Sequence, residues 1–499
     1  MTAPARKVPP VPGDAPGSRR ALYVSLVALS AVAAVLGFAR EAAMGALFGA
    51  SREADAFYAA FALPFVVAYF LVGGALVPPL VAGLAAHLTA GRDRDARALF
   101  SGTLLRTAAA GGVLVAAVAL LARPIARLLV PGFPSDAIAL TARLLAELAA
   151  YGLFSSLALV LSAGATAAGL YRIPAFAILA ANGLSVLLLL ALTPRLGIHA
   201  ATLSLLVASA LQLLVVLPFV LRAGLLGFAA ATEPRPPSRA TALLTLALVL
   251  SATVDLAERP FASAAGVGAV ALLGFASKLI HLPMRLVAAP LATVALPRLA
   301  AARTAGEKPE EAATLLRAIV NLLLLSSALA AGAAGPAVAL AFGRGRFDAA
   351  AVASLASLVV LLAPSVLFIG LIETTTKLLV TGSRLAPVVL AQGAGLAVYL
   401  VAAPVLAPRG IEGLAFARNL SWGTAAFLLT VALARSENGL GVFARAPRRL
   451  FATLLALGAA AAAVSAGLLP GPLLLTLVAG TAGTAAFLLA LPPRLWRAA

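Results

Sequence analysis

The sequence predicts an all-α polytopic membrane protein, with about fourteen transmembrane helices in two pseudo-symmetric six-helix lobes followed by two C-terminal helices. Hydrophobic residues make up 62% of the 499-residue chain and charged residues only 11%, whereas soluble globular chains carry roughly 25% charged residues. Apolar runs of about 20 residues, the length needed to cross a bilayer, recur along the whole chain. A pattern of Pro and Gly residues also recurs in the same order in both halves.

The apolar runs place the helices in order. The start of the chain, through Arg20, is polar and rich in Pro and Gly, and the apolar run after it lacks a signal-peptidase pattern close behind it. We therefore expect that run to be retained as the first span. The expected spans are 21–40, 56–82, 100–122, 137–163, 174–193, 196–221, 240–257, 264–297, 314–342, 351–376, 385–406, 411–434, 450–468 and 472–492.

The distribution of basic residues predicts the orientation of the chain. Most Lys and Arg residues in the loops fall on the cytoplasmic side if the N-terminus lies inside, as the positive-inside rule requires. An even number of spans also places both termini on one side. The expected organisation is a cytoplasmic N-terminal tail (1–20), an N-lobe with six spans (21–222), a cytoplasmic linker (223–239), a C-lobe with six spans (240–434), and two last spans with a short cytoplasmic C-terminus (435–499).

An internal repeat supports the two lobes. Each match is common in membrane helices, but the matches keep their order and a nearly constant offset, which indicates two homologous lobes in parallel orientation. In transporters of this plan the substrate site lies between the halves. The matches are Leu63-Pro64 and Pro78 with Leu282-Pro283 and Pro297, Pro131-Gly132-Phe133 and Asp136 with Gly343-Arg344-Gly345 and Asp348, and Arg172-Ile173-Pro174 with Arg384-Leu385-Ala386-Pro387.

Composition excludes several classes of function. The chain has no Cys, and its three His residues are too scattered for a metal cluster. The net charge of +19 is spread over loops instead of one face, so no nucleic-acid partner is expected. The one Asp pair next to basic residues in a loop, in Arg92-Asp93-Arg94-Asp95, is self-compensated, and no phosphate-binding Gly-Lys-Thr loop is found. We expect no catalytic residues, no metal, no cofactor and no enzymatic activity.

Charged residues inside the apolar spans are the main functional signal, because each costs roughly 2.5–3.5 kcal/mol at the bilayer centre. Lys278 and Arg285 share the eighth span, with His281 between them and Pro283 available to open the helix. The surrounding run contains no acid, which suits an anionic ligand such as a pyrophosphate. The alternative is that both side chains reach the membrane surface.

Charged residues at the beginning of the chain allow two interpretations. Arg40 and Glu41, at the end of the first span, form either a local ion pair at the membrane surface or part of a cavity. Asp55 is expected to support the second span, by capping a helix that begins at Ala56 or by pairing near Arg52.

Other charged groups are expected to be structural. Arg143 with Glu147, and Glu373 with Lys377, have the spacing of ion pairs on one helix face. Asp255, Glu258 and Arg259 precede Pro260 and are interpreted as a solvated turn, with a cation site or outer gate as the alternative.

The second span concentrates residues that weaken a helix. Pro64, Gly73-Gly74 and Pro78-Pro79 fit an element that bends during alternating access. Close packing against a neighbouring helix through the small Gly residues is the alternative.

An ordered set of motifs covers nearly the whole chain. These motifs are Gly37-Phe38-Ala39-Arg40-Glu41, Leu47-Phe48-Gly49-Ala50, Ala54-Asp55-Ala56-Phe57, Leu63-Pro64, Gly74-Ala75-Leu76, Pro131-Gly132-Phe133, Ala276-Ser277-Lys278-Leu279, Leu282-Pro283, Leu296-Pro297-Arg298-Leu299, and Phe342 to Asp348. Together they resemble the MurJ (MviN) family of lipid II flippases, within the multidrug/oligosaccharidyl-lipid/polysaccharide flippase superfamily. The resemblance implies export of an undecaprenyl-pyrophosphate-linked peptidoglycan precursor across the bacterial inner membrane, through a cationic cavity, by alternating access coupled to an ion gradient or membrane potential.

Two departures from the family pattern concern the cavity. Ala68-Tyr69 and Gly73 stand where the family has a basic pair and an acid, and Lys278 stands where the family typically has Arg, so the bidentate match to phosphate is lost. Arg285, at a position usually small in the family, is a hypothetical replacement for the lost charge. We expect Arg40, Lys278 and Arg285 to bind the substrate, with Glu41, Asp55, Pro64, Gly74 and Pro283 in supporting or gating roles.

Four functions are weighed on this basis. The first is a flippase for the peptidoglycan precursor, which serves cell-wall synthesis and cell shape, and the second is a flippase for another polyprenyl-pyrophosphate-linked glycan. A multidrug/cation antiporter should have unpaired carboxylates in its cavity, whereas the candidate residues here are basic. The fourth is a non-transporting scaffold for cell-wall synthesis proteins. The expected partners are the lipid-linked precursor, membrane lipids and, as an alternative, those proteins.

Overall fold

The computed structural model describes residues 16–227, 239–283, 309–381 and 384–435, and these segments are almost entirely helical. Eight of the described helices are long and apolar enough to cross a membrane, or up to ten if each of two bent helix pairs is one span. The expected spans 450–468 and 472–492 lie outside the described residues. Contacts within the chain divide it into two compact units, Met1–Ala264 and Ala265–Ala499.

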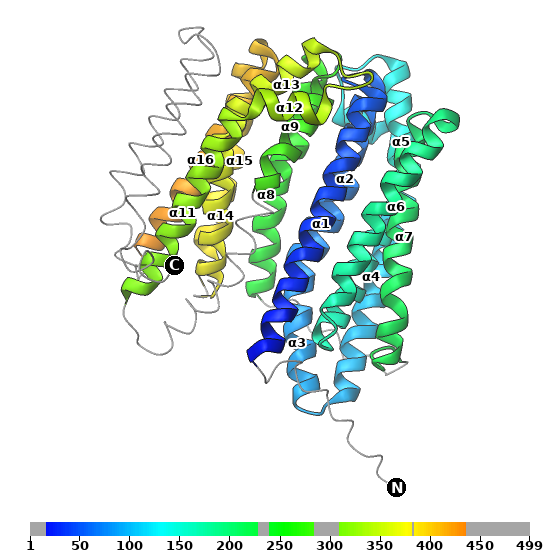
Figure 1. The fold of residues 1–499 in the computed structure, drawn as a ribbon, viewed down its shortest axis with the longest axis vertical. Helices are drawn as coiled ribbons and strands as arrows, with labels where there is room; N and C mark the ends of the chain where they lie inside the picture. The colour runs from blue at the N-terminus through cyan, green and yellow to red at the C-terminus, as the bar shows by residue number, and fades with distance from the viewer. Residues whose placement is uncertain (1–15, 228–238, 284–308, 382–383, 436–499) are drawn as a thin grey trace. The chain divides into compact units, whose positions relative to one another are not determined.

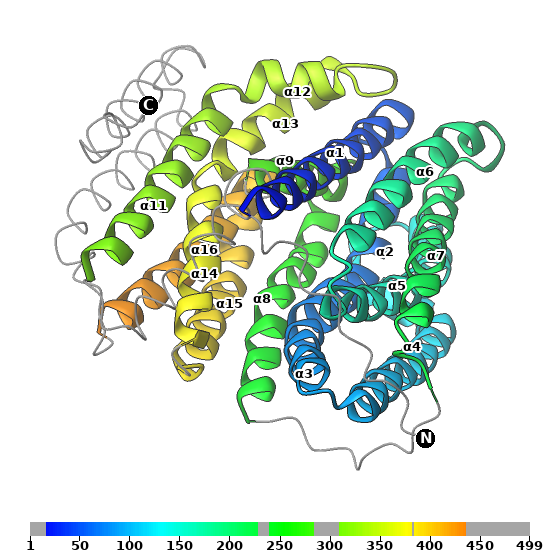
Figure 2. The same ribbon diagram turned by 60° about the horizontal axis from the view of Figure 1, so that its bottom comes forward.

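The first unit is built around α5, which packs against α2, α3, α4 and α7. Figure 2 shows α5 among α2, α4 and α7, and Figure 1 shows that the axes of the long helices of this unit are roughly parallel. Its elements are α1 (Pro16–Phe48), α2 (Arg52–Phe65), η1 (Val66–Leu76), α3 (Val77–Thr89), α4 (Asp93–Leu129), α5 (Ser135–Ala167), α6 (Arg172–Leu196), α7 (His199–Arg222) and α8 (Arg239–Ala264).

Small residues allow α5 to occupy this central position. A Cβ added at Gly152 would lie 3.3 Å from Cβ of Pro64, and one at Gly164 would lie 2.5 Å from Cε2 of the Phe100 ring. Small residues at helix contacts permit close backbone approach, which is how membrane helices gain packing energy. Phe100 belongs to a buried apolar core with Leu84 and Leu161.

The second span contains a π-helical stretch within the segment that holds the helix-weakening Pro and Gly residues. The candidate span Arg52–Thr89 passes from α2, which contains Pro64, through the π-helix η1 to α3, whose first turn contains Pro78 and Pro79. Gly74 lies in η1. Proline removes a hydrogen-bond donor, and π-helical turns are common at functional sites. The predicted irregularity is therefore present, whereas bending during transport stays a prediction.

The second unit contains two sharply bent helix pairs. Where single spans were expected over 314–342 and 351–376, α11 and α12 meet at 67°, and α13 and α14 meet at 46°. Pro364 begins α14 and cannot donate a backbone hydrogen bond, which explains the second break. The elements are α9 (Ala269–Pro283), α11 (Pro309–Gly332), α12 (Ala334–Phe342), α13 (Ala349–Leu362), α14 (Pro364–Thr381), α15 (Ala386–Leu406), η3 (Ala407–Arg409) and α16 (Gly410–Ala434).

Helix α8 packs within the first unit, against η1, α2 and α4. Its end is fixed by a hydrogen bond from the backbone N–H of Gly132 to Oγ of Ser263, at 3.0 Å. The sequence interpretation began the C-lobe at 240, with this helix. The division into two six-helix lobes stays a prediction.

Candidate functional site

A buried ionic cluster joins α1 and α2 in the first unit. Arg40 and Glu41 form an ion pair, in which 14% of the Arg40 side chain and 5% of the Glu41 side chain is exposed. Tyr58, two turns into α2, donates its hydroxyl to the second oxygen of Glu41 at 2.5 Å. The local ion pair expected for Arg40 and Glu41 is therefore present, but it is buried and has a partner on the next helix.

Aromatic side chains surround this cluster. The guanidinium of Arg40 lies 6.0 Å from the ring centre of Phe61, a distance typical of cation–π contacts. Phe61 stacks on Phe57, with ring centres 5.9 Å apart, and lies 5.7 Å from the ring of Tyr151 on α5. Side chains of α1, α2 and α5 thus shield the ion pair from solvent, and a shielded ion pair interacts more strongly than one in water.

Two residues of α8 add charge to the first unit. Glu258 is fully buried and Arg259 is 9% exposed, and Arg259 interacts electrostatically with Tyr58. The interpretation of Asp255, Glu258 and Arg259 as a solvated turn is therefore wrong for Glu258 and Arg259. Pro260 does not end the helix, which continues to Ala264, because transmembrane helices tolerate proline when neighbouring groups satisfy the backbone.

Asp55 does not cap α2. The N-cap is Ser51, whose Oγ accepts a hydrogen bond from the backbone N–H of Ala54 at 3.3 Å, so the helix begins at Arg52 instead of Ala56. Asp55 lies in the first turn and is 1% exposed. An acidic residue in a first turn interacts favourably with the helix dipole. The predicted capping role is wrong, and the alternative, a pairing near Arg52, stays a prediction.

The two predicted helix-face ion pairs had different outcomes. Lys377 and Glu373 pair on α14, with Nζ and Oε1 2.5 Å apart, as predicted. Glu147 instead bonds across helices, to Nδ1 of His199 at 2.7 Å and to the hydroxyl of Thr202, both on α7. Arg143 is exposed. The prediction for Arg143 and Glu147 is therefore wrong.

The second unit has its own polar cluster, between α9 and α16. Lys278 is half-buried on α9. Arg418 of α16 is 1% exposed and donates a hydrogen bond from Nη1 to Oγ of Ser277, the residue before Lys278, at 2.5 Å. Sequence reasoning missed Arg418, although an Arg in the middle of the apolar run 411–434 is the same signal that identified Lys278.

The remaining predicted site residues are distributed over both units. Arg40 belongs to the first unit and Lys278 to the second. Arg285 lies outside the described residues, and Pro283 is the last described residue of α9. A common binding site for the three cations stays a prediction. Within the described ranges, no three His, Asp or Glu side chains come together as a metal site would require.

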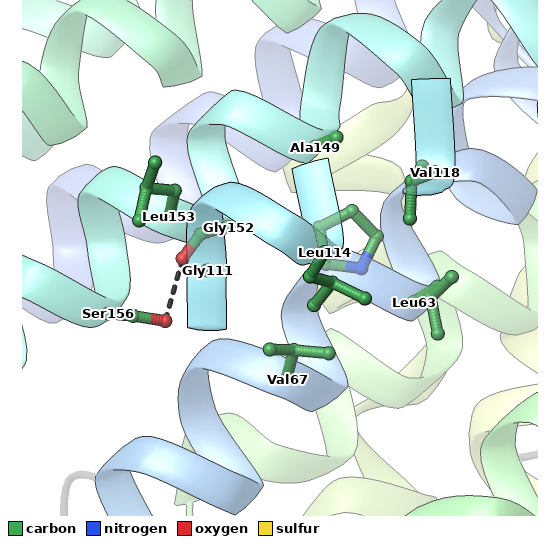
Figure 3. Close-up of a pocket in the computed structure, with 10 residues that line it drawn as sticks. Leu63, Val67, Gly111, Leu114, Val118, Ala149, Gly152, Leu153 and Ser156 are labelled. Carbon is green, nitrogen blue, oxygen red and sulfur yellow. Dashed lines mark hydrogen bonds between the residues drawn. The ribbon is translucent and has the colours of Figure 1, made fainter. Parts of the chain in front are cut away.

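The first unit also contains an apolar pocket beside Pro64. Figure 3 shows residues of α2, α4 and α5 around it, with the hydroxyl of Ser156 bonded to the Gly152 carbonyl at 2.7 Å. The lining offers no charge for a phosphate, so this pocket is not a candidate for the polar head of a lipid-linked precursor. It is lined by Leu63, Pro64, Val67, Gly111, Leu114, Val118, Ala149, Gly152, Leu153 and Ser156.

Known structures share this fold. A lipid II flippase MurJ in an inward closed conformation matches 94% of this chain and 98% of its own length, with a TM-score of 0.70 and 16% identity. A MATE transporter from Vibrio cholerae matches 84% of this chain and 99% of its own, with a TM-score of 0.58 and 17% identity. The predicted all-α polytopic fold is confirmed.

Sequence comparison identifies the family. A lipid II flippase MurJ from Burkholderia cenocepacia is 28% identical over 338 residues, which cover 63% of this chain and 64% of that protein's length. The family model described as lipid II flippase MurJ matches residues 44–479. The chain is a multi-pass membrane protein that belongs to the lipid II flippase MurJ family.

Proposed function

We propose that this protein moves the lipid-linked peptidoglycan precursor, lipid II, from the inner to the outer leaflet of the bacterial cytoplasmic membrane. The observation that carries the proposal is the match of the lipid II flippase family model to residues 44–479. A flippase needs no catalytic group, because it forms and breaks no covalent bond.

Cations on apolar helices support an anionic substrate. Each charged group inside an apolar helix costs energy unless a partner, water or a ligand compensates it, so such groups mark substrate pathways. Arg40 and Arg259 of the first unit, and Lys278 and Arg418 of the second, lie on helices of this kind. A pyrophosphate offers the oxygens that guanidinium and ammonium groups bind most strongly.

The proposed mechanism is alternating access, with both termini in the cytoplasm. The π-helical stretch η1 after Pro64 supports it, because a helix with a displaced hydrogen-bond pattern bends more easily than a regular one. The driving force would be an ion gradient or the membrane potential, which acts on charges that move within the membrane.

A second candidate is a flippase for another polyprenyl-pyrophosphate-linked glycan. The observation in its favour is the replacement of the family's second-span charges by Ala68, Tyr69 and Gly73. Loss of these charges alters contacts to the head group, where glycans differ from one another. The shared pyrophosphate would still bind the remaining cations.

Rescue of a bacterium depleted of its own lipid II flippase tests both candidates. Expression of the chain should restore growth and rod shape if lipid II is the substrate. Normal membrane levels without rescue would contradict the first candidate. Restored export of a different lipid-linked glycan, in a strain that lacks the corresponding flippase, would then favour the second.

A further inference from the structure

Four residues form a closed set of contacts between α9 and α16. Nη1 of Arg418 donates to Oγ of Ser277 at 2.5 Å, and the guanidinium of Arg418 lies 5.2 Å from the ring centre of Trp422. The Trp422 ring meets the His281 ring edge-on, with centres 6.3 Å apart. Nδ1 of His281 lies 2.6 Å from the carbonyl oxygen of Ser277. This set, Ser277, Arg418, Trp422 and His281, is called the α9–α16 ring below.

Helical spacing explains why the ring closes. Ser277 and His281 are four residues apart on α9, and Arg418 and Trp422 are four apart on α16, so each pair lies on one helix face. The carbonyl of Ser277 can only accept, which requires the proton on Nδ1 of His281. Lys278 follows Ser277 on α9, so its backbone belongs to the helical turn that carries Ser277 and His281.

We infer that Arg418 is a positioning residue, which holds Lys278 where it binds the pyrophosphate of the precursor. This inference rests on the proposed function. Arg418 is 1% exposed, whereas Lys278 and Trp422 are half-buried, so Arg418 supports the site from behind. A lysine has many rotamers, and a binding site gains affinity when its support removes the cost of ordering that side chain.

The same geometry explains how the chain uses Lys at position 278. Lysine binds phosphate as a point charge and lacks the fixed fork of arginine. Its affinity therefore depends more on where the surrounding structure places its stem. The α9–α16 ring supplies that placement through the turn of α9 that contains Ser277.

Tryptophan fluorescence gives a direct test, because the chain has only two Trp residues. Trp496→Phe leaves Trp422, inside the ring, as the single fluorophore. The purified full chain with this substitution is titrated with undecaprenyl pyrophosphate and, separately, with uncharged undecaprenol. We expect Arg418→Met to raise the Kd for the pyrophosphate by about three- to tenfold, the cost of ordering one side chain. The Kd for undecaprenol should stay unchanged, and Arg418→Lys should retain more affinity than Arg418→Met.

Two smaller substitutions test the inference with less perturbation of the fold. Ser277 donates to the Leu273 carbonyl of its own helix at 2.8 Å and also accepts from Arg418, whereas Thr424 donates to the Leu420 carbonyl at 2.8 Å. Ser277→Ala should therefore weaken pyrophosphate binding, and Thr424→Ala should not. Equal affinities of Ser277→Ala and Thr424→Ala for the pyrophosphate would overturn the inference. Equal losses of affinity for undecaprenyl pyrophosphate and undecaprenol in Arg418→Met would overturn it as well.

The proposed function and the inference can fail separately. Rescue of flippase-depleted cells by the wild type, with the same pyrophosphate affinity in Arg418→Met, would refute the positioning role and leave the flippase function standing. Absence of rescue, with the expected loss of affinity in Arg418→Met, would refute the lipid II flippase and retain the pyrophosphate site.

Discussion

Tyr58 on α2 donates a hydrogen bond to Glu41 on α1, and this bond ties the buried Arg40–Glu41 ion pair to the second helix. The two helices are joined by a tight turn in which Gly49 has a φ of 62°. Such a backbone conformation favours glycine. The turn and the hydrogen bond together fix how α1 meets α2.

The Tyr58 hydroxyl should stabilise the protein measurably. Tyr58→Phe removes one donor to a charged acceptor, which costs about 1.5–3 kcal/mol. We expect a lower melting temperature in detergent. Tyr171→Phe, a substitution of the same size at a partly exposed site, should leave it unchanged. Identical melting temperatures for Tyr58→Phe and the wild type would contradict the contact.

The cost of replacing Glu41 or Glu147 should depend on how deeply its ion pair is buried. Glu41→Gln leaves Arg40 buried without its acid and should cost about 3–5 kcal/mol. Glu147→Gln affects a pair in which both side chains are 39% exposed, and should cost about 0–1 kcal/mol. Thermal unfolding of both variants tests this order. An equal loss of stability in the two variants would show that burial does not determine the cost.

The start of α2 offers a test of the corrected cap. Ser51→Ala should destabilise the protein by about 1 kcal/mol, while Ser51→Asn, which keeps an acceptor, should cost little. Differential scanning calorimetry of the two variants measures these losses of stability. A larger effect of Asn than of Ala would be inconsistent with capping by Ser51.

Topology can be measured cleanly because the chain has no Cys. A single Pro237→Cys substitution, in the linker predicted to be cytoplasmic, should be labelled by a membrane-impermeant maleimide only after the cells are opened. A second variant, Arg127→Cys, in a segment predicted to face outward and exposed in the structure, should be labelled in intact cells. The reverse pattern would show that the predicted orientation is wrong.

The sequence was sufficient for the fold class and for most helix positions, because a bilayer requires long apolar runs that are visible without a structure. The predicted span 137–163 corresponds to Ser135–Ala167, and 196–221 to His199–Arg222. The bends between α11 and α12 and between α13 and α14 were not predicted, because they leave hydropathy almost unchanged.

Contacts between helices explain the errors at the candidate site. Spacing along one helix reveals neighbours on the same face, so Lys377 and Glu373 were paired correctly. It does not reveal that Glu147 meets His199, or that Arg418 meets Ser277, because those partners lie on other helices. Glu258 and Arg259 were placed in a turn because proline usually ends a helix in soluble proteins.

The cations of the eighth span should decide transport. Lys278→Ala and Arg285→Ala should each abolish rescue of flippase-depleted cells, because each removes a charge expected to bind the pyrophosphate. Lys278→Arg keeps the charge and should retain rescue. Membrane levels of every variant, measured by immunoblot, serve as the control.

The most direct measurement is the amount of lipid II accessible in the outer leaflet of cells depleted of their own flippase. We expect the wild-type chain to restore outer-leaflet lipid II, and the Lys278→Ala/Arg285→Ala double variant to leave it at the depleted level despite normal insertion. Full outer-leaflet lipid II with the double variant would contradict the anionic-substrate mechanism, and none with the wild type at normal membrane levels would contradict the proposed function itself.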